Sequence, residues 1–476
     1  MSNSSPVSKD SVAIGGASGF IGQALGHALA CRFKVIGVAR GAVPTDTDLC
    51  EWRNADLTNL RQTEQALAGA RYAVYLVHSM MPSGRATRAS FADLDLLCAD
   101  NFSRAAARAG VEQIVYLGGL MPEGKVLSPH LKSRREVEET LACQGVPVTT
   151  LRAGLVLGGG GSSFEILAKL VGRLPAMVCP RWTETLMQPI SLDDVVNLLS
   201  FTVGRKECYG QTFDVGAPEA LSYRELMRMC AELLGVKRPM LPVRLFTPSL
   251  SRLWVSLVTG APRALVGPLV ESLRHEMVVR NHRLADMAGL TPMPAKKALA
   301  LAIDADSSRV GWPVRTHHNK VRKANLVKSI SRMHLPKNCD AVWAAAEYAR
   351  WLPLAVRSLV RVESDVLHNI RFFLRFLRVS LLLLQRIAHR CASDRQVFSI
   401  SGGVLSRASQ GGHFELRQVL DKRTLLIAIH DYRPRLPWFV YICTQALIHS
   451  WVMSSFRRHL ARMGRDKTVM MVQHDR

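Results

Sequence analysis

Residues 11–22 read SVAIGGASGFIG, and this stretch decides the fold of the first part of the chain. The apolar run before the glycines predicts a β-strand, and FIGQALGHALAC predicts a helix directly after it. Gly16 permits a tight turn, Gly19 lets backbone N–H groups approach a pyrophosphate, and Gly22 lets helix and strand pack closely. The helix N-terminus also favours a negative charge. A tight turn without a ligand is the alternative, but this context predicts dinucleotide binding at Gly16, Ala17, Gly19, Phe20, Ile21 and Gly22.

The first 200 residues alternate short apolar runs with amphipathic segments, which is typical of a parallel sheet with crossover helices. FKVIGVAR, RYAVYLVHSM, EQIVYLGGL and PVTTLRAGLVLG predict further strands, and FADLDLLCADNFSRAAARAG predicts a long helix. From about 220 to 300 the pattern is mainly helical, which we interpret as a small substrate lobe. We therefore expect an α/β domain over 11–300, built on a doubly wound parallel Rossmann sheet.

The other ranges differ in composition from this domain. Residues 1–10 and 466–476 are expected to be tails, and the polar, basic stretch 301–327 is expected to be a linker. Residues 328–465 predict a C-terminal α+β domain with a helix at DAVWAAAEYARWL, a meander of strands and a long closing helix from Leu436. Such a meander resembles the helix-grip architecture, which cradles an apolar ligand between sheet and helix.

The charge of the chain is uneven. The net charge is +24, and residues 301–476 hold 29 Lys+Arg against 12 Asp+Glu, whereas residues 1–300 hold 33 against 26. A basic excess of this kind favours contact with polyanions, and general solubility is the alternative. The run NIRFFLRFLRVSLLLLQRIAHR is typical either of a segment lying on anionic lipid or of a buried strand or helix. No interleaved aromatic–basic pattern or helix-turn-helix signal is present, so we do not expect direct nucleic-acid binding.

The ten cysteines are scattered and form no C-x-x-C motif. Neither a metal site nor a disulfide framework is expected, and a reducing, cytoplasmic location is favoured, with peripheral association at the inner face of the membrane as an option. The apolar stretch from Leu436 contains His and Gln and is not expected to span a membrane. The sequence leaves open whether the chain binds a protein partner.

The residues that end the next strands indicate which dinucleotide is bound. The second strand ends in Arg40, where an NAD-binding protein keeps an acidic residue for the ribose. A guanidinium can pair with the 2′-phosphate of NADP, so NADP is favoured over NAD, and a solvated arginine is the alternative. Asp56 and Leu57 are expected at the adenine edge. The residues expected beside the cofactor at the end of the following strand are Val77, His78 and Ser79.

Several motifs together carry a family resemblance: GGASGFIG, Arg40, Asp56-Leu57, YLVHSM, IVYLGGL, SRREVE and QPISLDDV. With them, residues 10 to about 300 resemble the atypical short-chain dehydrogenase/reductase superfamily. Within it they are similar to the bacterial NAD(P)-binding group related to NmrA-like regulators and to the Rossmann subunit of respiratory complex I. Some members of that group carry an uncharacterised C-terminal domain. The resemblance implies a Rossmann fold with a bound dinucleotide.

The resemblance also implies a catalytic serine and a Tyr-x-x-x-Lys pair, and this chain lacks all three. Aligning SRREVE with the helix that carries the pair puts Arg134 at the lysine position and His130 at the tyrosine position. The serine position falls near Gly118 and Gly119. Three interpretations stay open: His130 is a substitute acid/base, the helix keeps only a cofactor-holding role with Arg134 and Gly118, or the pair is plain surface.

Two functions follow from these readings. The first is an NADPH-dependent reductase or isomerase of an apolar carbonyl compound or quinone, with His130 as its acid/base. The alternative is a catalytically inactive sensor of NAD(P)H or an assembly factor that acts through protein or membrane contacts.

Overall fold

The computed structural model divides the chain into two compact units, and each is described by itself. One unit comprises residues 1–81 and 95–319, and the other comprises residues 82–94 and 320–476. The residues that the structure describes are 9–41, 50–78, 86–124, 126–243, 256, 258–260, 267, 270–307, 326–356, 360–365, 369–374, 379–407, 412–420 and 422–474.

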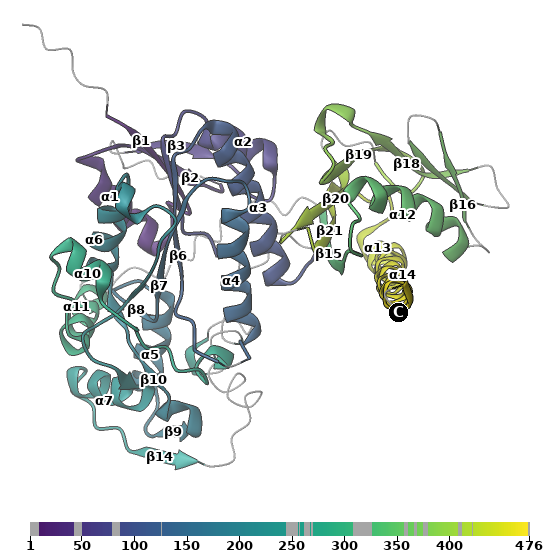
Figure 1. Ribbon diagram of the computed structural model, residues 1–476. Coiled ribbons are helices and arrows are strands. Elements are labelled where there is room, and N and C mark those ends of the chain that lie inside the picture. Colours follow the sequence, from purple (N-terminus) through teal and green to yellow (C-terminus); the bar gives the residue numbers. More distant parts are fainter. Residues whose placement is uncertain are drawn as a thin grey trace, which may run out of the picture. The chain divides into compact units, whose positions relative to one another are not determined.

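The first unit is built on a seven-stranded sheet in which every pairing is parallel. Its order is β12-β7-β6-β4-β1-β2-β3 (Figure 1). The chain order reverses between β1 and β4, and this is the point at which doubly wound sheets bind their ligands. The strands are β1 (Ser11–Gly15), β2 (Lys34–Ala39), β3 (Cys50–Asn54), β4 (Tyr72–Tyr75), β6 (Gln113–Gly119), β7 (Val148–Ala153) and β12 (Thr212–Val215).

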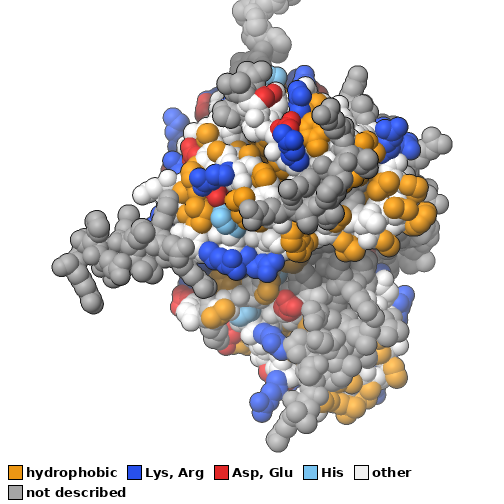
Figure 2. All heavy atoms as spheres, turned by 90° about the vertical axis from the view of Figure 1, so that its right-hand side faces the viewer, with side chains coloured by type: hydrophobic (Ala, Val, Ile, Leu, Met, Phe, Trp, Pro, Cys, Tyr) orange, Lys and Arg blue, Asp and Glu red, His pale blue; other side chains and the backbone are white. Residues whose placement is uncertain are grey.

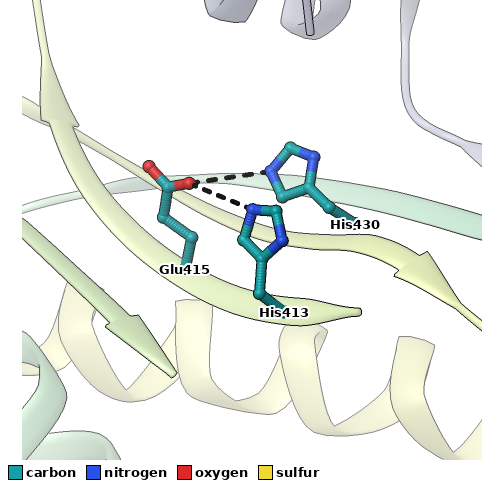
Figure 3. A group of neighbouring side chains, drawn as sticks. All are labelled: His413, Glu415 and His430. Atoms are coloured by element: carbon teal, nitrogen blue, oxygen red, sulfur yellow. Dashed lines mark ion pairs between the residues drawn. The ribbon is translucent and has the colours of Figure 1, made fainter. Parts of the chain in front are cut away.

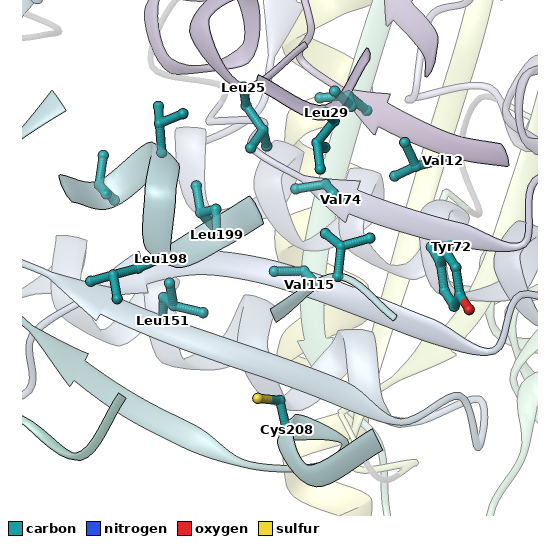
Figure 4. Close-up of a cluster of buried hydrophobic side chains, with 14 of the residues drawn as sticks. Val12, Leu25, Leu29, Tyr72, Val74, Val115, Leu151, Leu198, Leu199 and Cys208 are labelled. Carbon is teal, nitrogen blue, oxygen red and sulfur yellow. The ribbon is translucent and has the colours of Figure 1, made fainter. Parts of the chain in front are cut away.

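Helices cover both faces of this sheet because alternate residues of each strand are apolar on opposite sides. On one face, Val12 and Val74 pack against residues of α1 (Phe20–Ala30) and α6 (Leu192–Thr202), as Figure 4 shows. On the other face, Ala13 and Tyr75 pack against a second set of helices. These are α2 (Leu60–Leu67), α3 (Phe91–Ala109) and α4 (Pro129–Ala142). The doubly wound Rossmann architecture predicted from the sequence is confirmed.

The lobe expected over about 220–300 shares one hydrophobic core with the segment 156–191. Phe164, Leu226 and Leu299 contribute to this core. Ser222 and Glu225 form a capping box that starts helix α7. The helices of these two segments are α5 (Ser162–Arg173), α7 (Tyr223–Leu233), α10 (Arg283–Ala288) and α11 (Ala295–Ser307). Their short strands are β8 (Val156–Leu157), β9 (Met177–Pro180), β10 (Leu186–Met187), β11 (Ile190–Ser191), β13 (Leu221–Ser222) and β14 (Met240–Val243).

The second unit is an eight-stranded sheet in the order β16-β17-β18-β19-β20-β21-β15-β5. All pairings are antiparallel except that of β15 with β5. The strands are β5 (Ala86–Arg88), β15 (Val327–His334), β16 (Val360–Ser364), β17 (Ile370–Leu374), β18 (Ser380–Arg386), β19 (Arg395–Gly402), β20 (His413–Val419) and β21 (Thr424–Tyr432). The helices are α12 (Ala341–Ala355), α13 (Trp438–Cys443) and α14 (Gln445–His474).

Helices α12 and α14 pack on one face of this sheet through an aromatic core. The Tyr348 ring lies 5.5 Å from that of Phe414 on β20 and 5.1 Å from that of Phe456 on α14. The α+β class predicted for this region, a meander with a closing helix, is therefore confirmed. These three rings belong to one hydrophobic core between the sheet and the two helices.

Several boundaries differ from the predicted ranges. Residues 82–94 belong to the second unit, because β5 pairs with β15. Helix α11 runs to Ser307, into the stretch expected to be a linker, and α14 runs to His474, through the stretch expected to be a tail. The basic apolar run between Asn369 and Arg390 contains the antiparallel strands β17 and β18, which excludes one amphipathic helix lying on lipid.

Candidate active site

A pocket of about 470 Å³ opens at the carboxyl ends of the central strands of the parallel sheet. It is lined by the glycine loop after β1, by the residues that follow β4, by the end of β6 and by the first turns of α4. The lobe contributes further lining residues, among them Tyr223, Ser272 and Met277. The pocket thus lies at the switch point of the sheet, where a nucleotide and a substrate can meet.

The glycine loop forms one end of the pocket. Gly16 has a φ of +86°, a conformation that residues with a Cβ rarely adopt. The N–H groups of Gly16 and Ala17 donate to the Val38 carbonyl at 3.1 and 3.3 Å, which ties the turn to β2. A Cβ on Gly22 would lie 2.3 Å from the Gly16 carbonyl oxygen, so α1 can approach only without a side chain there. Binding of a pyrophosphate by this loop stays a prediction.

His78, which follows β4, is held by a carboxylate. Its Nδ1 lies 2.8 Å from Oδ2 of Asp95, which is fully buried on α3. An ionised carboxylate only accepts hydrogen bonds, so Nδ1 carries the proton and Nε2 keeps its lone pair. Burial, followed by the charge of Arg134, lowers the pKa of His78, although Asp95 opposes the shift. The imidazole is therefore neutral at neutral pH.

Arg134 is a buried residue and not part of a surface pair. It is 6% exposed, and its guanidinium donates from Nε to the hydroxyl of Tyr116 at 2.9 Å and from Nη2 to the same oxygen. Its Nη1 lies 3.9 Å from Oδ2 of Asp95. Burial raises the pKa of Tyr116 to about 12, so this phenol stays protonated and is a poor acid at neutral pH. The plain-surface interpretation of the predicted pair is wrong for this residue.

His130 lies on α4 one turn before Arg134, with its ring centroid 5.1 Å from that of His78. Burial, His78 and Arg134 together lower the pKa of His130 to about 3. Burial is the largest of these causes. A protonated His130 is thus rare at neutral pH.

The structure gathers most of the predicted site residues in one place. The pocket is lined by Gly16, Gly19, Phe20, Ile21, Gly22, His78, Gly118, His130 and Arg134. Ala17 and Leu57 are core residues, and Val77 packs at the margin of the core. Oδ1 of Asp56 accepts hydrogen bonds from the N–H and the hydroxyl of Thr58. Arg40 is exposed directly after β2, and Ser79 lies outside the described residues.

Sequence reasoning missed Asp95 and Tyr116 as members of the site. Asp95 lies between the buried Leu94 and Leu96 on α3, in the run FADLDLL, and an acidic residue on a buried helix face is a signal that it has a partner. Tyr116 lies within the predicted strand EQIVYLGGL and carries no comparable signal, because tyrosine is common in buried strands.

A second group of charged residues lies in the other unit, on β20 and β21. His413 and His430 face each other across the two strands, and Oε2 of Glu415 lies 3.8 Å from Nε2 of each ring (Figure 3). Two histidines and a carboxylate within 4.8 Å of one another match the donor set of some zinc sites. The sequence analysis did not identify this group, which we call the Glu415 cluster.

Two arginines contact the Glu415 cluster, and they indicate whether it is a metal site or a cluster of ion pairs. Arg395 donates to Glu415 from Nε at 2.8 Å, and Arg417 donates to the same oxygen. Burial alone would raise the pKa of Glu415, but Arg417 and Arg395 outweigh it and hold this pKa well below its ordinary value. Both guanidinium groups already donate to this carboxylate, so a divalent cation would have to compete with two cations for it. The geometry favours a buried ion-pair cluster.

Comparison with known proteins places the first unit in context. The model of the NAD dependent epimerase/dehydratase family matches residues 12–142. The auxiliary protein GraX of Staphylococcus aureus (strain NCTC 8325 / PS 47) is 27% identical over 144 residues, which are 30% of this chain and 43% of GraX. The match thus spans less than half the length of that relative.

Solved structures resemble the same part of the chain. Triphenylmethane reductase of Citrobacter sp., complexed with NADP(H), matches with a TM-score of 0.50 at 18% identity, over 61% of this chain and 99% of that one. The NADPH-dependent quinone oxidoreductase QOR2 of Escherichia coli, complexed with NADPH, gives a TM-score of 0.49 at 16% identity, over 61% and 98%. The family match and the Rossmann sheet confirm the resemblance that the sequence motifs indicated.

Proposed function

We propose that the first unit is an NAD(P)-dependent oxidoreductase whose substrate is a small, largely apolar carbonyl compound, alcohol or quinone. One observation carries the proposal: a strand–glycine–helix loop and a carboxylate-held histidine line the same pocket. The glycine loop would hold the pyrophosphate against the N-terminus of α1. A bound nicotinamide dinucleotide supplies hydride transfer.

The lining of the pocket suits an apolar substrate. Leu117, Leu155 and Met277 line it together with the ring of Tyr223. Such walls exclude water from a reacting carbonyl and offer few hydrogen bonds to a sugar or a carboxylate. The epimerase/dehydratase family match and the NADP(H) bound to the Citrobacter reductase support the reaction class, and the substrate within that class is our proposal.

Fluorescence titration of the full chain with NADPH and NADH tests this function and the preference for NADP. NADPH should bind at submillimolar concentration and about tenfold more tightly than NADH, because Arg40 can form a charge-assisted contact with the 2′-phosphate. Arg40→Asp should weaken NADPH binding and reverse the preference. Arg228→Asp, the same charge change on the exposed face of α7, should leave both affinities unchanged.

Three outcomes of this titration are informative. A parent chain that binds neither dinucleotide in the submillimolar range would exclude the proposed function. If Arg40→Asp binds NADPH as the parent does, the role given to Arg40 is wrong. Tight NADPH binding without turnover of any quinone, enone or secondary alcohol would favour the alternative function, a sensor of NAD(P)H.

A second property, contact with an anionic membrane surface, is proposed from the C-terminal helices. On α13 and α14 large apolar side chains are exposed: Phe439 72%, Ile442 40%, Leu447 56%, Ile448 59% and Trp451 49%. Exposed Arg457 and Arg458 follow on α14. Figure 2 shows hydrophobic and Lys/Arg side chains interspersed on one face of the molecule. No helix among the described residues is long and apolar enough to cross a membrane.

Co-sedimentation with liposomes tests this property. The full chain should sediment with vesicles of phosphatidylcholine and phosphatidylglycerol, and less so at high salt. The double variant Phe439→Asp/Trp451→Asp should lose at least about 90% of the bound fraction, because each change puts a charge in the apolar group. Leu301→Asp, at an apolar position on α11 that is 45% exposed, serves as the control. Binding by the double variant at the level of the parent would contradict the proposal.

A further inference from the structure

The pocket contains three basic side chains, His78, His130 and Arg134. The last two occupy the positions at which the family resemblance implies tyrosine and lysine. The three side chains come from two elements, since His78 follows β4 and the other two lie on α4. Only an imidazole can exchange a proton near neutral pH, because a guanidinium stays charged. The contacts of His78 and His130 indicate which of the two imidazoles exchanges a proton with the substrate.

We propose that His78, oriented by Asp95, transfers the substrate proton in this pocket, and that Arg134 acts as a positioning residue. This inference rests on the proposed oxidoreductase function. It differs from the interpretation of the sequence in which His130 is the substitute acid/base, where His78 only borders the cofactor.

The first argument is the orientation of the His78 ring. The 2.8 Å contact with Asp95 places the ring proton on Nδ1. The other nitrogen, Nε2, is buried and has no hydrogen-bond partner among the described residues. His78 lines the pocket, so a substrate hydroxyl that reaches this buried lone pair would find an acceptor there.

The second argument is that a carboxylate can stabilise a charged His78. When Nε2 takes up a proton, the imidazolium that forms lies against the buried Asp95. This is the pairing by which a carboxylate fixes the tautomer of a general base and supports its charged form. His130, in contrast, has Arg134 one turn away on α4 and His78 beside it, and both disfavour a proton on its ring.

Arg134 supports the pair without taking part in proton exchange. Two N–H groups of the guanidinium donate to the hydroxyl oxygen of Tyr116. The same hydroxyl donates to the backbone carbonyl of Arg134 at 3.2 Å. Nη1 of Arg134 lies 3.9 Å from the same Asp95 oxygen that accepts from His78. The guanidinium thus lies beside the carboxylate that orients His78, and in this position it helps to hold the Asp95 side chain in place.

Atoms, electrons and protons balance in the proposed reaction. In the oxidising direction the carbinol C–H bond breaks and its electron pair leaves as hydride to the oxidised dinucleotide. The hydroxyl proton passes to Nε2 of His78, and the products are a carbonyl compound, the reduced dinucleotide and an imidazolium paired with Asp95. In the reducing direction Nε2 of the imidazolium returns its proton to the oxygen as hydride adds to the carbonyl carbon.

The pH dependence follows from the lowered pKa of His78. Alcohol oxidation needs the neutral imidazole, so its kcat should rise with pH through this lowered pKa and stay level at neutral pH. Carbonyl reduction needs the imidazolium, so its kcat should fall as pH rises through the same value. The ionisable groups beside His78 are Asp95 on α3 and His130 and Arg134 on α4. Tyr75 on β4 and Tyr116 on β6 interact in turn with Asp95 and Arg134.

Kinetics of single variants test the assignment against a panel of secondary alcohols and enones. His78→Gln should lower kcat at least about 100-fold while its NADPH affinity stays within about threefold of the parent. Asp95→Asn should lower kcat by a similar factor, whereas His130→Gln should lower it less than about tenfold. His27→Gln, a change of an exposed histidine on α1, should leave kcat unchanged. Equal rates for His78→Gln and the parent would overturn the proposal.

Nitrogen-15 NMR of the histidine rings, in the full chain without any dinucleotide, gives a readout that does not depend on turnover. At pH 7 the parent should show a protonated Nδ1 and an unprotonated Nε2 for His78, assigned by loss of the signal in His78→Gln. In Asp95→Asn the pKa of His78 should be lower still, because the negative charge that supports the imidazolium is gone. An Nε2–H tautomer in the parent would overturn the inference. Failure of NADPH to bind would instead exclude the proposed function.

Discussion

Replacing Gly22 with alanine should weaken NADPH binding on the order of 100-fold, equivalent to the loss of about 2.7 kcal/mol of binding free energy. The new Cβ would lie 2.3 Å from the Gly16 carbonyl oxygen and 2.8 Å from the Cα of Ala17. Both contacts are with backbone, so no side chain can rotate away and α1 must move off the loop. The N–H groups at the start of α1 then no longer meet a pyrophosphate bound by the loop.

The same change should lower the free energy of unfolding by about 1–3 kcal/mol, as overpacking of a close contact does. Chemical denaturation and the NADPH titration measure the two effects separately. Gly172→Ala is the matched control, because an added Cβ at this glycine near the end of α5 meets nothing within 4 Å. If Gly22→Ala binds NADPH as tightly as the parent, the glycine loop is not the pyrophosphate site.

The features of the first unit that the sequence predicted are local ones. The strand, the spaced glycines and the following helix lie within about twenty residues, and each has a distinct backbone requirement that can be read from residue type. The identity of His78 as a strand-end residue near the site follows from the same reasoning, since parallel strands present their carboxyl ends together.

The partners of these residues could not be predicted in the same way. Asp95 lies seventeen residues after His78, and their contact depends on how α3 is rotated against the sheet. Packing against the whole core sets this rotation, which no local pattern encodes. Residues 82–94 joined the second unit for a related reason, because pairing of β5 with β15 connects segments more than 230 residues apart.

The Glu415 cluster is a different case, because its signal was present. In HFELR the polar residues His413, Glu415 and Arg417 alternate with apolar ones, and a strand places alternate residues on one face. The sequence predicts a meander of strands in this region, so three ionisable side chains on a common face of one strand could have been inferred. Their burial could not, since an alternating strand normally exposes its polar face to water.

Glu415→Gln should cause the largest loss of stability of any change considered, about 3–5 kcal/mol in the free energy of unfolding of the second unit. The Glu415 side chain is 2% exposed, and Arg395 and Arg417 both donate to it. Removing its charge takes the Glu415 carboxylate away from two buried guanidinium groups, which costs more than the ion pair itself contributed. Glu363→Gln on β16 removes an exposed pair with Arg361 and should cost less than about 1 kcal/mol.

The stabilisation that Glu415 contributes should be full at neutral pH and should decrease in acid. The pKa of Glu415 in the folded chain is well below its ordinary value, so the cluster is most stabilising above the pKa of the unfolded chain. This contribution is lost only as the pH falls below about 4.5, toward the lowered folded value. The difference in melting temperature between parent and Glu415→Gln should therefore be constant from pH 6 to 8 and shrink in acid. A zinc-dependent rise in melting temperature that Glu415→Gln abolishes would contradict the ion-pair assignment and favour a metal site.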